Sequence, residues 1–182
     1  PEAATLAPSD PVVINYTSGS TGDPKGVILS DRALWSNIRY SIDGLTFLHP
    51  SDSTICMLPL AHMFGLLVDL LHPFVKGCHI HFVTRTPSPA IIMDAFATVK
   101  PKLIVSVPLV IEKIIRKKVL PLLDKNPLKT LVRIPVVKSI IYRKLHDKLI
   151  AAFGGNLQEL ILGGAAVSPD VESLLRKIRF PF

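Results

Sequence analysis

The strongest constraint on the fold of this chain is the order in which two kinds of apolar segment follow one another. Short runs rich in β-branched residues alternate with longer segments that have the spacing of amphipathic helices. This alternation predicts an α/β fold with a mostly parallel sheet and helices on both of its faces. The first two short runs, at residues 12–16 and 27–29, are separated only by a glycine-rich loop, so we expect them to form an antiparallel strand pair.

Local signals divide the remaining sequence into strands and helices. Further strands are predicted at residues 54–58, 78–83, 103–107 and 157–162. Helices are predicted at residues 31–45, 62–75, 90–99 and 128–153, and also after Pro108 and after Ser168. Either Ser30 or Asp31 can cap the first helix and Ser168 can cap the last, and Gly77 and Gly154-Gly155 are stop signals. We interpret residues 1–182 as one domain, and as an incomplete one, because a strand is expected after the last helix.

Composition excludes several classes of protein. Apolar residues make up 48% of the chain and charged residues 19%, which is typical of an ordered globular domain rather than a disordered segment. The longest candidate for a membrane span, residues 58–75, contains His62, Asp69, His72 and Pro73, so we expect no transmembrane helix. The polar, proline-rich start does not resemble a secretory signal. Cys56 and Cys78 have no metal-ligand spacing and are expected to be buried free thiols in a reducing compartment.

Positive charge is concentrated in one stretch of the chain. The net charge is +7, and eleven of the 21 cationic residues lie at residues 113–148. They are Lys113, Arg116, Lys117, Lys118, Lys125, Lys129, Arg133, Lys138, Arg143, Lys144 and Lys148. The stretch is either a solvated helical face or a contact with an anionic membrane surface or a polyanionic ligand. A nucleic-acid partner is not expected, because no recognised motif accompanies the charge.

The loop at residues 17–26 has the composition of an anion-binding loop. It contains three glycines, four hydroxyl side chains and Lys25. Glycines allow several backbone N–H groups to converge on one anion, and a lysine supplies a positive charge for phosphate oxygens. Because Lys25 is followed by Gly26 and a strand, the loop is not a Walker A motif, and the dinucleotide fingerprint is also missing. The alternative is a flexible hairpin tip.

The loop closely resembles the signature loop of the adenylate-forming superfamily, which includes acyl-CoA synthetases, firefly luciferase and peptide-synthetase adenylation domains. In that family the loop holds the β- and γ-phosphates of ATP and closes over them. The resemblance assigns this role to Thr17, Ser18, Gly19, Ser20, Thr21, Gly22 and Lys25. It also implies ATP, Mg²⁺ and coenzyme A as cofactor and co-substrates.

Two further segments resemble motifs of the same superfamily. Residues 58–65 match a motif in which a histidine or an aromatic residue lies near the substrate carboxylate, and His62 is the matching position. Residues 160–167 match a segment whose backbone lies against the adenine, which assigns adenine binding to Gly163, Gly164 and Ala165. From the residues alone, a structural histidine and a tight turn between strand and helix are the alternatives. The resemblance assigns catalytic roles to Thr17, Lys25 and His62.

Residues 106–114 resemble the long-chain fatty acyl-CoA synthetase branch of the superfamily. That branch commonly has an aromatic residue where Ile111 stands, and in some members this residue gates the tunnel that holds the acyl chain. Whether Ile111 or Trp35 has such a role here is left open. From its residue type, Trp35 is expected in the core, and Asp69 and Asp94 are expected on the surface. No metal site is assigned, because His79 and His81 alternate along one strand without a further ligand.

The resemblance covers essentially the whole chain and implies part of the N-terminal domain of a long-chain fatty acid–CoA ligase. Such an enzyme activates a fatty carboxylate with ATP and transfers the acyl group from acyl-AMP to coenzyme A. The family's Tyr-Gly-x-Thr-Glu segment, which carries the usual Mg²⁺ partner, would follow Phe182, so we expect the 182 residues alone to be inactive. The alternatives are a non-catalytic nucleotide-binding module of the same fold and a ligase for an aryl or medium-chain acid. The resemblance places such an enzyme in the cytoplasm, or peripherally at a membrane face.

Overall fold

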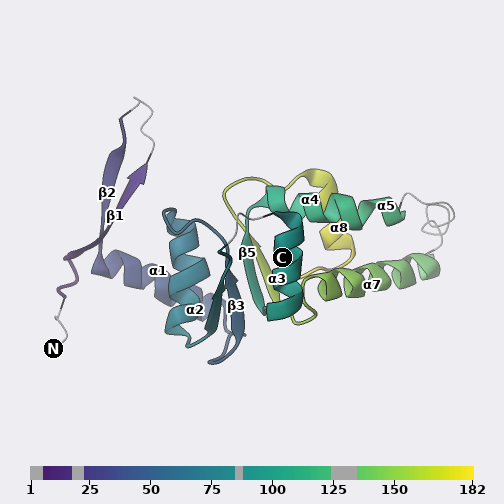
Figure 1. Cartoon of the computed structure of the whole chain (residues 1–182), viewed down its shortest axis with the longest axis horizontal. Helices are drawn as coiled ribbons and strands as arrows, with labels where there is room; N and C mark the ends of the chain where they lie inside the picture. Colours follow the sequence, from purple (N-terminus) through teal and green to yellow (C-terminus); the bar gives the residue numbers. More distant parts are fainter. Residues whose placement is uncertain (1–5, 18–22, 85–87, 124–134) are drawn as a thin grey trace.

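A four-stranded parallel sheet forms the centre of the computed structural model, which describes residues 6–17, 23–84, 88–123 and 135–182. In chain order its strands are β3 (Ser53–Cys56), β4 (His79–Phe82), β5 (Leu103–Ser106) and β6 (Glu159–Leu162). In space their order is β4-β3-β5-β6, and every neighbouring pair is parallel (Figure 1). The predicted parallel sheet is therefore confirmed.

Helices cover both faces of the sheet, as the alternation predicted. On one face lie the π-helix η1 (Gly65–Leu71) and α2 (His72–Val75), and α1 (Asp31–Gly44) packs against both of them. On the other face lie α3 (Pro89–Val99), α4 (Pro108–Lys118), α7 (Pro135–Ala152) and α8 (Pro169–Lys177), and the short α5 (Leu120–Leu123) follows α4. Ser30 and Ser88 cap α1 and α3 through their hydroxyl oxygens.

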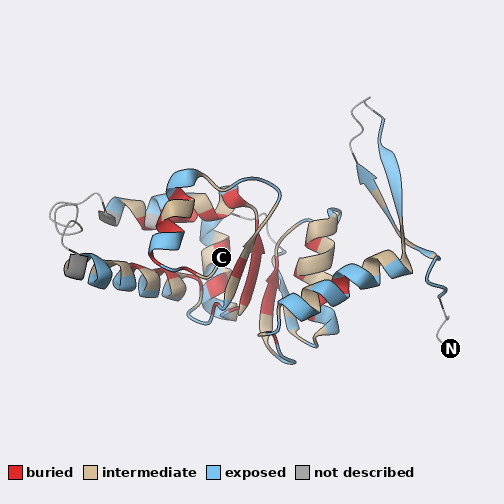
Figure 2. Ribbon diagram, turned by 180° about the vertical axis from the view of Figure 1, so that it is seen from behind, coloured by how far each residue is buried: buried red, intermediate tan, exposed pale blue. Residues whose placement is uncertain are grey.

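The two faces of β5 point into two different cores. Leu103 and Val105 pack on the η1 side, together with Leu48, Phe64 and Val68. Ile104 points the other way, into a larger core formed by apolar residues of α3, α4, α7 and α8. All four residues of β5 are buried, and Figure 2 shows the buried residues gathered in the central strands and on the helix faces turned toward them. The apolar run at residues 103–105 is thus explained by burial on both sides.

A two-stranded hairpin projects from this body. β1 (Pro11–Thr17) and β2 (Lys25–Ser30) pair antiparallel, as predicted, with Ile14 opposite Ile28 and Thr17 opposite Lys25 (Figure 1). Ile14, Tyr16 and Ile28 are largely exposed, so the hairpin is held by its own ladder more than by burial.

Three sequence predictions need correction. Trp35 is 51% exposed rather than in the core, because α1 lies at the edge of the molecule and of its residues only Ile38 is buried. Asp69 is 2% exposed rather than on the surface, because its carboxylate accepts backbone hydrogen bonds. Cys78 is only partly buried and precedes β4, whereas Cys56 is buried within β3, and both are free thiols.

One predicted helix is only partly within the described residues, and another has an unexpected geometry. The helix predicted at residues 128–153 is described from Pro135, where α7 begins, and residues 128–134 lie outside the described part. The helix predicted at residues 62–75 begins at residue 63 and contains the π-helical segment η1, in which the N–H of His72 bonds to the carbonyl of Leu67, five residues earlier.

Gly154 is predicted to be essential where α7 packs beside α3, whereas its neighbour Gly155 is not. Both have positive φ angles, +97° and +82°. A Cβ on Gly154 would overlap the carbonyl oxygen of Phe96 and lie 2.8 Å from Lys100 Cα, but a Cβ on Gly155 would meet nothing within 4 Å. Gly155→Ala should therefore lower the free energy of unfolding by about 1 kcal/mol, from backbone strain alone. Gly154→Ala should lower it by about 3 kcal/mol or more in urea denaturation. Equal losses would contradict this interpretation.

Candidate functional site

The carboxyl ends of β3 and β5 mark the place where ligands bind in open parallel sheets. After β3 the chain turns onto one face to form η1, and after β5 it turns onto the opposite face to form α4. Neighbouring strands whose connections leave to opposite faces leave a crevice between their carboxyl ends. Residues 58–65 follow β3 and residues 163–165 follow β6, so the structure brings both motif-bearing segments to this edge.

Buried Asp69 holds the first of these segments in place. Its Oδ2 atom accepts hydrogen bonds from the backbone N–H groups of Met57 and Leu58, at 2.8 and 2.9 Å, directly after β3 ends. A Cβ at Gly65 would lie 2.7 Å from the carbonyl oxygen of Pro59, so the start of η1 packs closely under the loop. His62 lies at the exposed tip of this turn, where its N–H donates to Pro59 at 3.1 Å.

The second segment meets the first through a glycine and an aromatic ring. The N–H of Gly163 donates to the carbonyl of Ser106 at 3.1 Å, which joins the ends of β5 and β6. The ring of Phe64 lies against Gly163, so closely that a Cβ there would be 2.6 Å from the ring. Gly164 has a φ of +83°, and Ala165 is exposed. A glycine at position 163 is therefore required by the approach of Phe64.

The far end of the loop at residues 163–168 is anchored to α4. The N–H of Ser168 donates to Glu112 Oε1 at 2.6 Å, and Arg116 donates to Ser168 Oγ at 2.9 Å and to both carboxylate oxygens of Asp170. The contact with Arg116 lowers the pKa of Asp170. Ser168 has the extended backbone of an N-cap, but its hydroxyl accepts from Arg116 and not from α8. Arg116 belongs to the basic stretch that was expected to face either solvent or an anion. In the structure it holds this loop against α4 instead, through its contacts with Ser168 and Asp170.

The hairpin that carries Thr17 and Lys25 is tied to the same region by one side chain. Asn15 Nδ2 donates to the carbonyl of Ala61 at 2.7 Å, next to His62. Thr17 and Lys25 pair across the ladder at the hairpin end, and Lys25 is exposed. Ser18, Gly19, Ser20, Thr21 and Gly22 lie outside the described residues. This contact of Asn15 was not predicted from the sequence, although a polar residue within an otherwise apolar strand indicates that its side chain has a specific partner.

An apolar cavity adjoins the site on the η1 side. Its volume is about 260 Å³, and it lies between β2, α1 and the start of the helix that contains η1. Its lining residues are Leu29, Ala33, Leu34, Asn37, Met63, Phe64 and Leu67. Phe64 therefore separates this cavity from Gly163. Trp35 and Ile111 do not line it, since Trp35 faces solvent and Ile111 is fully buried among α3, α4 and α8.

The buried polar groups beneath the site have shifted pKa values. Burial raises the pKa of Asp69 to about 6, although the two backbone N–H donors oppose this shift. Burial, assisted by the Asp69 carboxylate, raises the pKa of the Cys56 thiol to about 12. Burial and nearby Lys76 lower the pKa of His72 to about 4. At neutral pH this layer therefore contains an ionised Asp69, a neutral His72 and an unreactive thiol.

The neutral His72 is oriented by Ser41. The Ser41 hydroxyl lies 2.7 Å from the carbonyl of Ile38 and 2.9 Å from His72 Nδ1. Because the hydroxyl has one hydrogen and the carbonyl can only accept, Nδ1–H donates to Ser41 and Nε2 is unprotonated. Nε2 has no partner among the described residues.

The other candidate residues do not form a further site at this edge. His79 and His81 are exposed on β4, and the described residues contain no group of three or more potential metal ligands. Within the basic stretch, Lys113, Lys117, Lys138, Arg143, Lys144 and Lys148 are exposed, whereas Lys125, Lys129 and Arg133 lie outside the described residues. None of the described helices is long and apolar enough to cross a membrane.

Comparison with known proteins identifies the family. The family model described as AMP-binding enzyme matches residues 1–181, and the chain therefore belongs to this family. Long-chain-fatty-acid–CoA ligase 1 of Saccharomyces cerevisiae is 30% identical over 186 residues, which cover 92% of this chain and 26% of that ligase. Long chain acyl-CoA synthetase 1 of Arabidopsis thaliana is 29% identical and is covered to 27%. The chain thus spans about a quarter of the length of these relatives.

Solved structures of adenylate-forming enzymes have the same fold. The o-succinylbenzoate CoA synthetase of Bacillus subtilis superposes with a TM-score of 0.68 at 18% identity, over 97% of this chain and 29% of that chain. The N-terminal domain of FACL13 from Mycobacterium tuberculosis gives a TM-score of 0.66 at 16% identity, over 97% and 36% of the two chains. The expected fold, part of the N-terminal domain of these enzymes, is confirmed.

Asp69 and His72 are predicted to give opposite contributions to the pH dependence of stability. Asp69 stabilises the fold most below its unfolded pKa of 3.8, and this contribution is lost as pH rises through about 6. His72 stabilises most above 6.5, and its contribution is lost as pH falls through about 4. Between about pH 4 and pH 6, the free energy of unfolding changes by about 3 kcal/mol through each group, in opposite directions, so the two changes nearly cancel.

Asp69→Asn should remove this cancellation, because an amide oxygen can still accept the two backbone N–H groups without titrating. We expect the variant to lose about 3 kcal/mol relative to the unaltered chain between pH 7 and pH 4, measured by urea denaturation across that range. Asp94→Asn is the matched control, since that carboxylate is exposed on α3. Parallel pH profiles for Asp69→Asn and the unaltered chain would refute the assignment.

Proposed function

We propose that this chain carries the ATP-binding and carboxylate-side segments of a long-chain fatty acid–CoA ligase. The observation that carries the proposal is the contact of Phe64 with Gly163, which joins residues 58–65 and 163–165 at the carboxyl edge of the sheet. The hydrogen bond from Asn15 to Ala61 ties the phosphate-loop hairpin to the same place. Membership of the AMP-binding family and the long-chain relatives support this assignment.

Each segment has a role that its chemistry suits. Lys25, an exposed cation at the end of the hairpin, and Thr17 beside it would hold ATP phosphate oxygens together with Ser18, Gly19, Ser20, Thr21 and Gly22. The backbone of Gly163, Gly164 and Ala165 would lie against the adenine. The exposed His62 would lie near the carboxylate of the acid. Mg²⁺, when bound, would neutralise phosphate charge, and no described residue is proposed as its ligand.

The proposed reaction has two steps. A carboxylate oxygen of the fatty acid attacks the α-phosphorus of ATP, and the bond to the β-phosphate oxygen breaks to release pyrophosphate and leave acyl-AMP. The thiol of coenzyme A, losing its proton, then attacks the acyl carbonyl, and AMP leaves. Residues of this chain would contribute by positioning the carboxylate and stabilising phosphate charge, which are the main sources of catalysis in phosphoryl and adenylyl transfer.

An aryl acid is the second candidate substrate. The 4-coumarate–CoA ligase 2 of Oryza sativa is 36% identical over 47% of this chain, which is the observation that favours this candidate. The long-chain relatives cover more of the chain, 92% and 96% for two ligases of Saccharomyces cerevisiae. A fatty acid is therefore the first candidate.

The proposal extends to cellular location. A cytoplasmic protein, in contact with an anionic membrane through the cations at residues 113–148, would meet its fatty acid substrate at the lipid surface. The exposed positions of Lys113, Lys117, Lys144 and Lys148 favour such a contact.

Lys25→Ala is predicted to weaken ATP binding by the 182-residue chain by about tenfold or more, because one charge-assisted contact to phosphate is lost. Isothermal titration with ATP measures the change. Lys25→Arg should restore part of the affinity, and Lys144→Ala, an exposed lysine on α7, is the matched control. Unchanged affinity in Lys25→Ala would refute the assignment of the phosphate loop.

ATP–pyrophosphate exchange should separate the proposed enzyme from a non-catalytic nucleotide-binding module. The 182 residues alone are expected to give no exchange, while a longer protein that contains them should exchange with long-chain fatty acids faster than with 4-coumarate or a medium-chain acid. Faster exchange with 4-coumarate would transfer the assignment to aryl acids. ATP binding without exchange for any acid in the longer protein would identify a non-catalytic module.

A further inference from the structure

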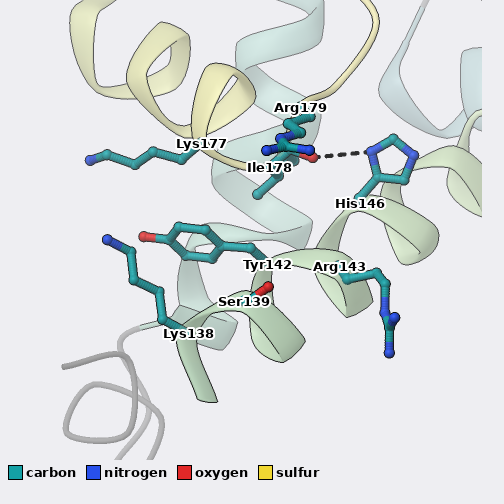
Figure 3. Close-up of a pocket in the computed structure, with 8 residues that line it drawn as sticks. All are labelled: Lys138, Ser139, Tyr142, Arg143, His146, Lys177, Ile178 and Arg179. Atoms are coloured by element: carbon teal, nitrogen blue, oxygen red, sulfur yellow. Dashed lines mark hydrogen bonds between the residues drawn. The ribbon is translucent and has the colours of Figure 1, made fainter. Parts of the chain in front are cut away.

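A basic pocket lies between α7 and the C-terminal end of α8 (Figure 3). α8 begins beside the anchored loop at residues 163–168, so the pocket is at the opposite end of this helix. The pocket has a volume of about 600 Å³ and is lined by Lys138, Ser139, Tyr142, Arg143, His146, Lys177, Ile178 and Arg179. Four lining residues are lysine or arginine, and none carries a carboxylate.

These four cations have no counter-charge within the described part of the chain. The ion pairs found there are Lys102–Asp52, Arg116–Asp170 and Arg176–Glu172, and none includes a lining residue. Arg116 differs from these four residues: it belongs to the same basic stretch, but its charge is paired with that of Asp170. Several positive charges around one concave surface repel one another and attract a multiply charged anion more strongly than any of them would alone.

Three side chains of the pocket are placed so that they can donate hydrogen bonds to a phosphate group. Lys138, Tyr142 and Lys177 point to the same side of the pocket, whereas Arg143 points away from them (Figure 3). Lys138 Nζ lies 5.5 Å from the centroid of the Tyr142 ring. Two ammonium groups and a phenolic hydroxyl, supplied by two different helices, can donate to separate oxygens of one phosphate group.

The junction between the two helices is fixed by a hydrogen bond. His146 Nδ1 donates to the carbonyl of Ile178 at 3.1 Å, and the dashed line in Figure 3 marks this contact. This contact holds the C-terminal end of α8 against α7, so that lysines of both helices line one pocket. The helix C-terminus itself favours Lys177 and Arg179, but it does not account for Lys138, which comes from α7.

Arg179 occupies a backbone position that ordinarily favours glycine. Its φ is +54°, and the turn that ends α8 is closed by a hydrogen bond from Phe180 N to the carbonyl of Leu175. A side chain at this position costs conformational energy that glycine would not. The positive side chain of Arg179 is thus held at the pocket despite backbone strain.

We propose that this pocket binds a multiply charged phosphate group, carried by a phosphorylated metabolite in solution or by a phosphorylated lipid headgroup. The site shares no residue with the hairpin or with residues 58–65 and 163–165, so it does not rest on the proposed ligase function. Its ligand is recognised by charge and hydrogen bonding.

Titration of the 182-residue chain with inositol trisphosphate, followed by two-dimensional NMR, tests the site directly. Amide shifts are expected at residues 142–146 and 177–179, and not in the hairpin. The double variant Lys138→Ala/Lys177→Ala should weaken binding about tenfold or more, since two charge-assisted contacts are lost. Arg32→Ala/Arg39→Ala is the matched control, because it removes the same charge from exposed positions of α1 that do not line the pocket. The change in affinity for the control should be about twofold or less.

Vesicles separate the two sources of the phosphate group. The chain is mixed with phosphatidylcholine vesicles that contain either phosphatidylinositol bisphosphate or phosphatidylserine at equal charge. Binding that requires the bisphosphate and is lost in Lys138→Ala/Lys177→Ala identifies a lipid headgroup, whereas binding of inositol trisphosphate without vesicle binding identifies a metabolite. No shift at residues 142–146 and 177–179, or equal weakening in both double variants, would overturn the proposal. Tyr142→Phe, which keeps the ring and removes only the hydroxyl, should weaken binding while leaving the fold unchanged.

Discussion

The parallel pairing of β3 with β5 is the interaction on which the rest of the structure depends. β5 is buried along its whole length. Its side chains alternate between the two cores: Leu103 and Val105 enter one, and Ile104 enters the other. The same pairing aligns the ends of the strands, so that the segments after β3, β5 and β6 emerge at one edge. Loss of this register would separate Phe64 from Gly163 and would remove both faces of the sheet from their cores at once.

The hairpin depends on the body in a different way. Its two strands are paired with each other, and its apolar side chains are mostly exposed. Near its base, backbone hydrogen bonds from Asp31 to Asp10 and from Arg32 to Pro8 connect it to α1, and Asn15 connects it to Ala61. Few contacts therefore fix the angle between the hairpin end, with Thr17 and Lys25, and the rest of the molecule.

Patterns local to the sequence predicted most of the helices and strands. The β-branched runs form strands and Ser30 caps α1, as expected. The ring that approaches Gly163 is that of Phe64, a contact between distant segments that was not predicted. Whether the residues of the site act as the family resemblance implies remains a prediction. Interactions between distant segments were not readable: nothing around Asp69 indicated that it would accept hydrogen bonds from Met57 and Leu58, and nothing around Arg116 pointed to Ser168. The basic pocket likewise needs Lys138 and Lys177, which are 39 positions apart in the sequence.

The π-helical geometry of η1 limits which insertions and deletions this part of the sequence can tolerate. Its wide turns place Asp69 beneath the end of β3 and, three residues later, His72 against Ser41. A π-helical turn is equivalent to one residue inserted into an α-helix. Deleting Leu70 or Leu71 would leave one residue in place of two between Asp69 and His72, so the two side chains could no longer reach both the end of β3 and Ser41 from one helix. The number of residues in this segment is therefore more tightly constrained than their identity, and an insertion or deletion here would be more damaging than most substitutions.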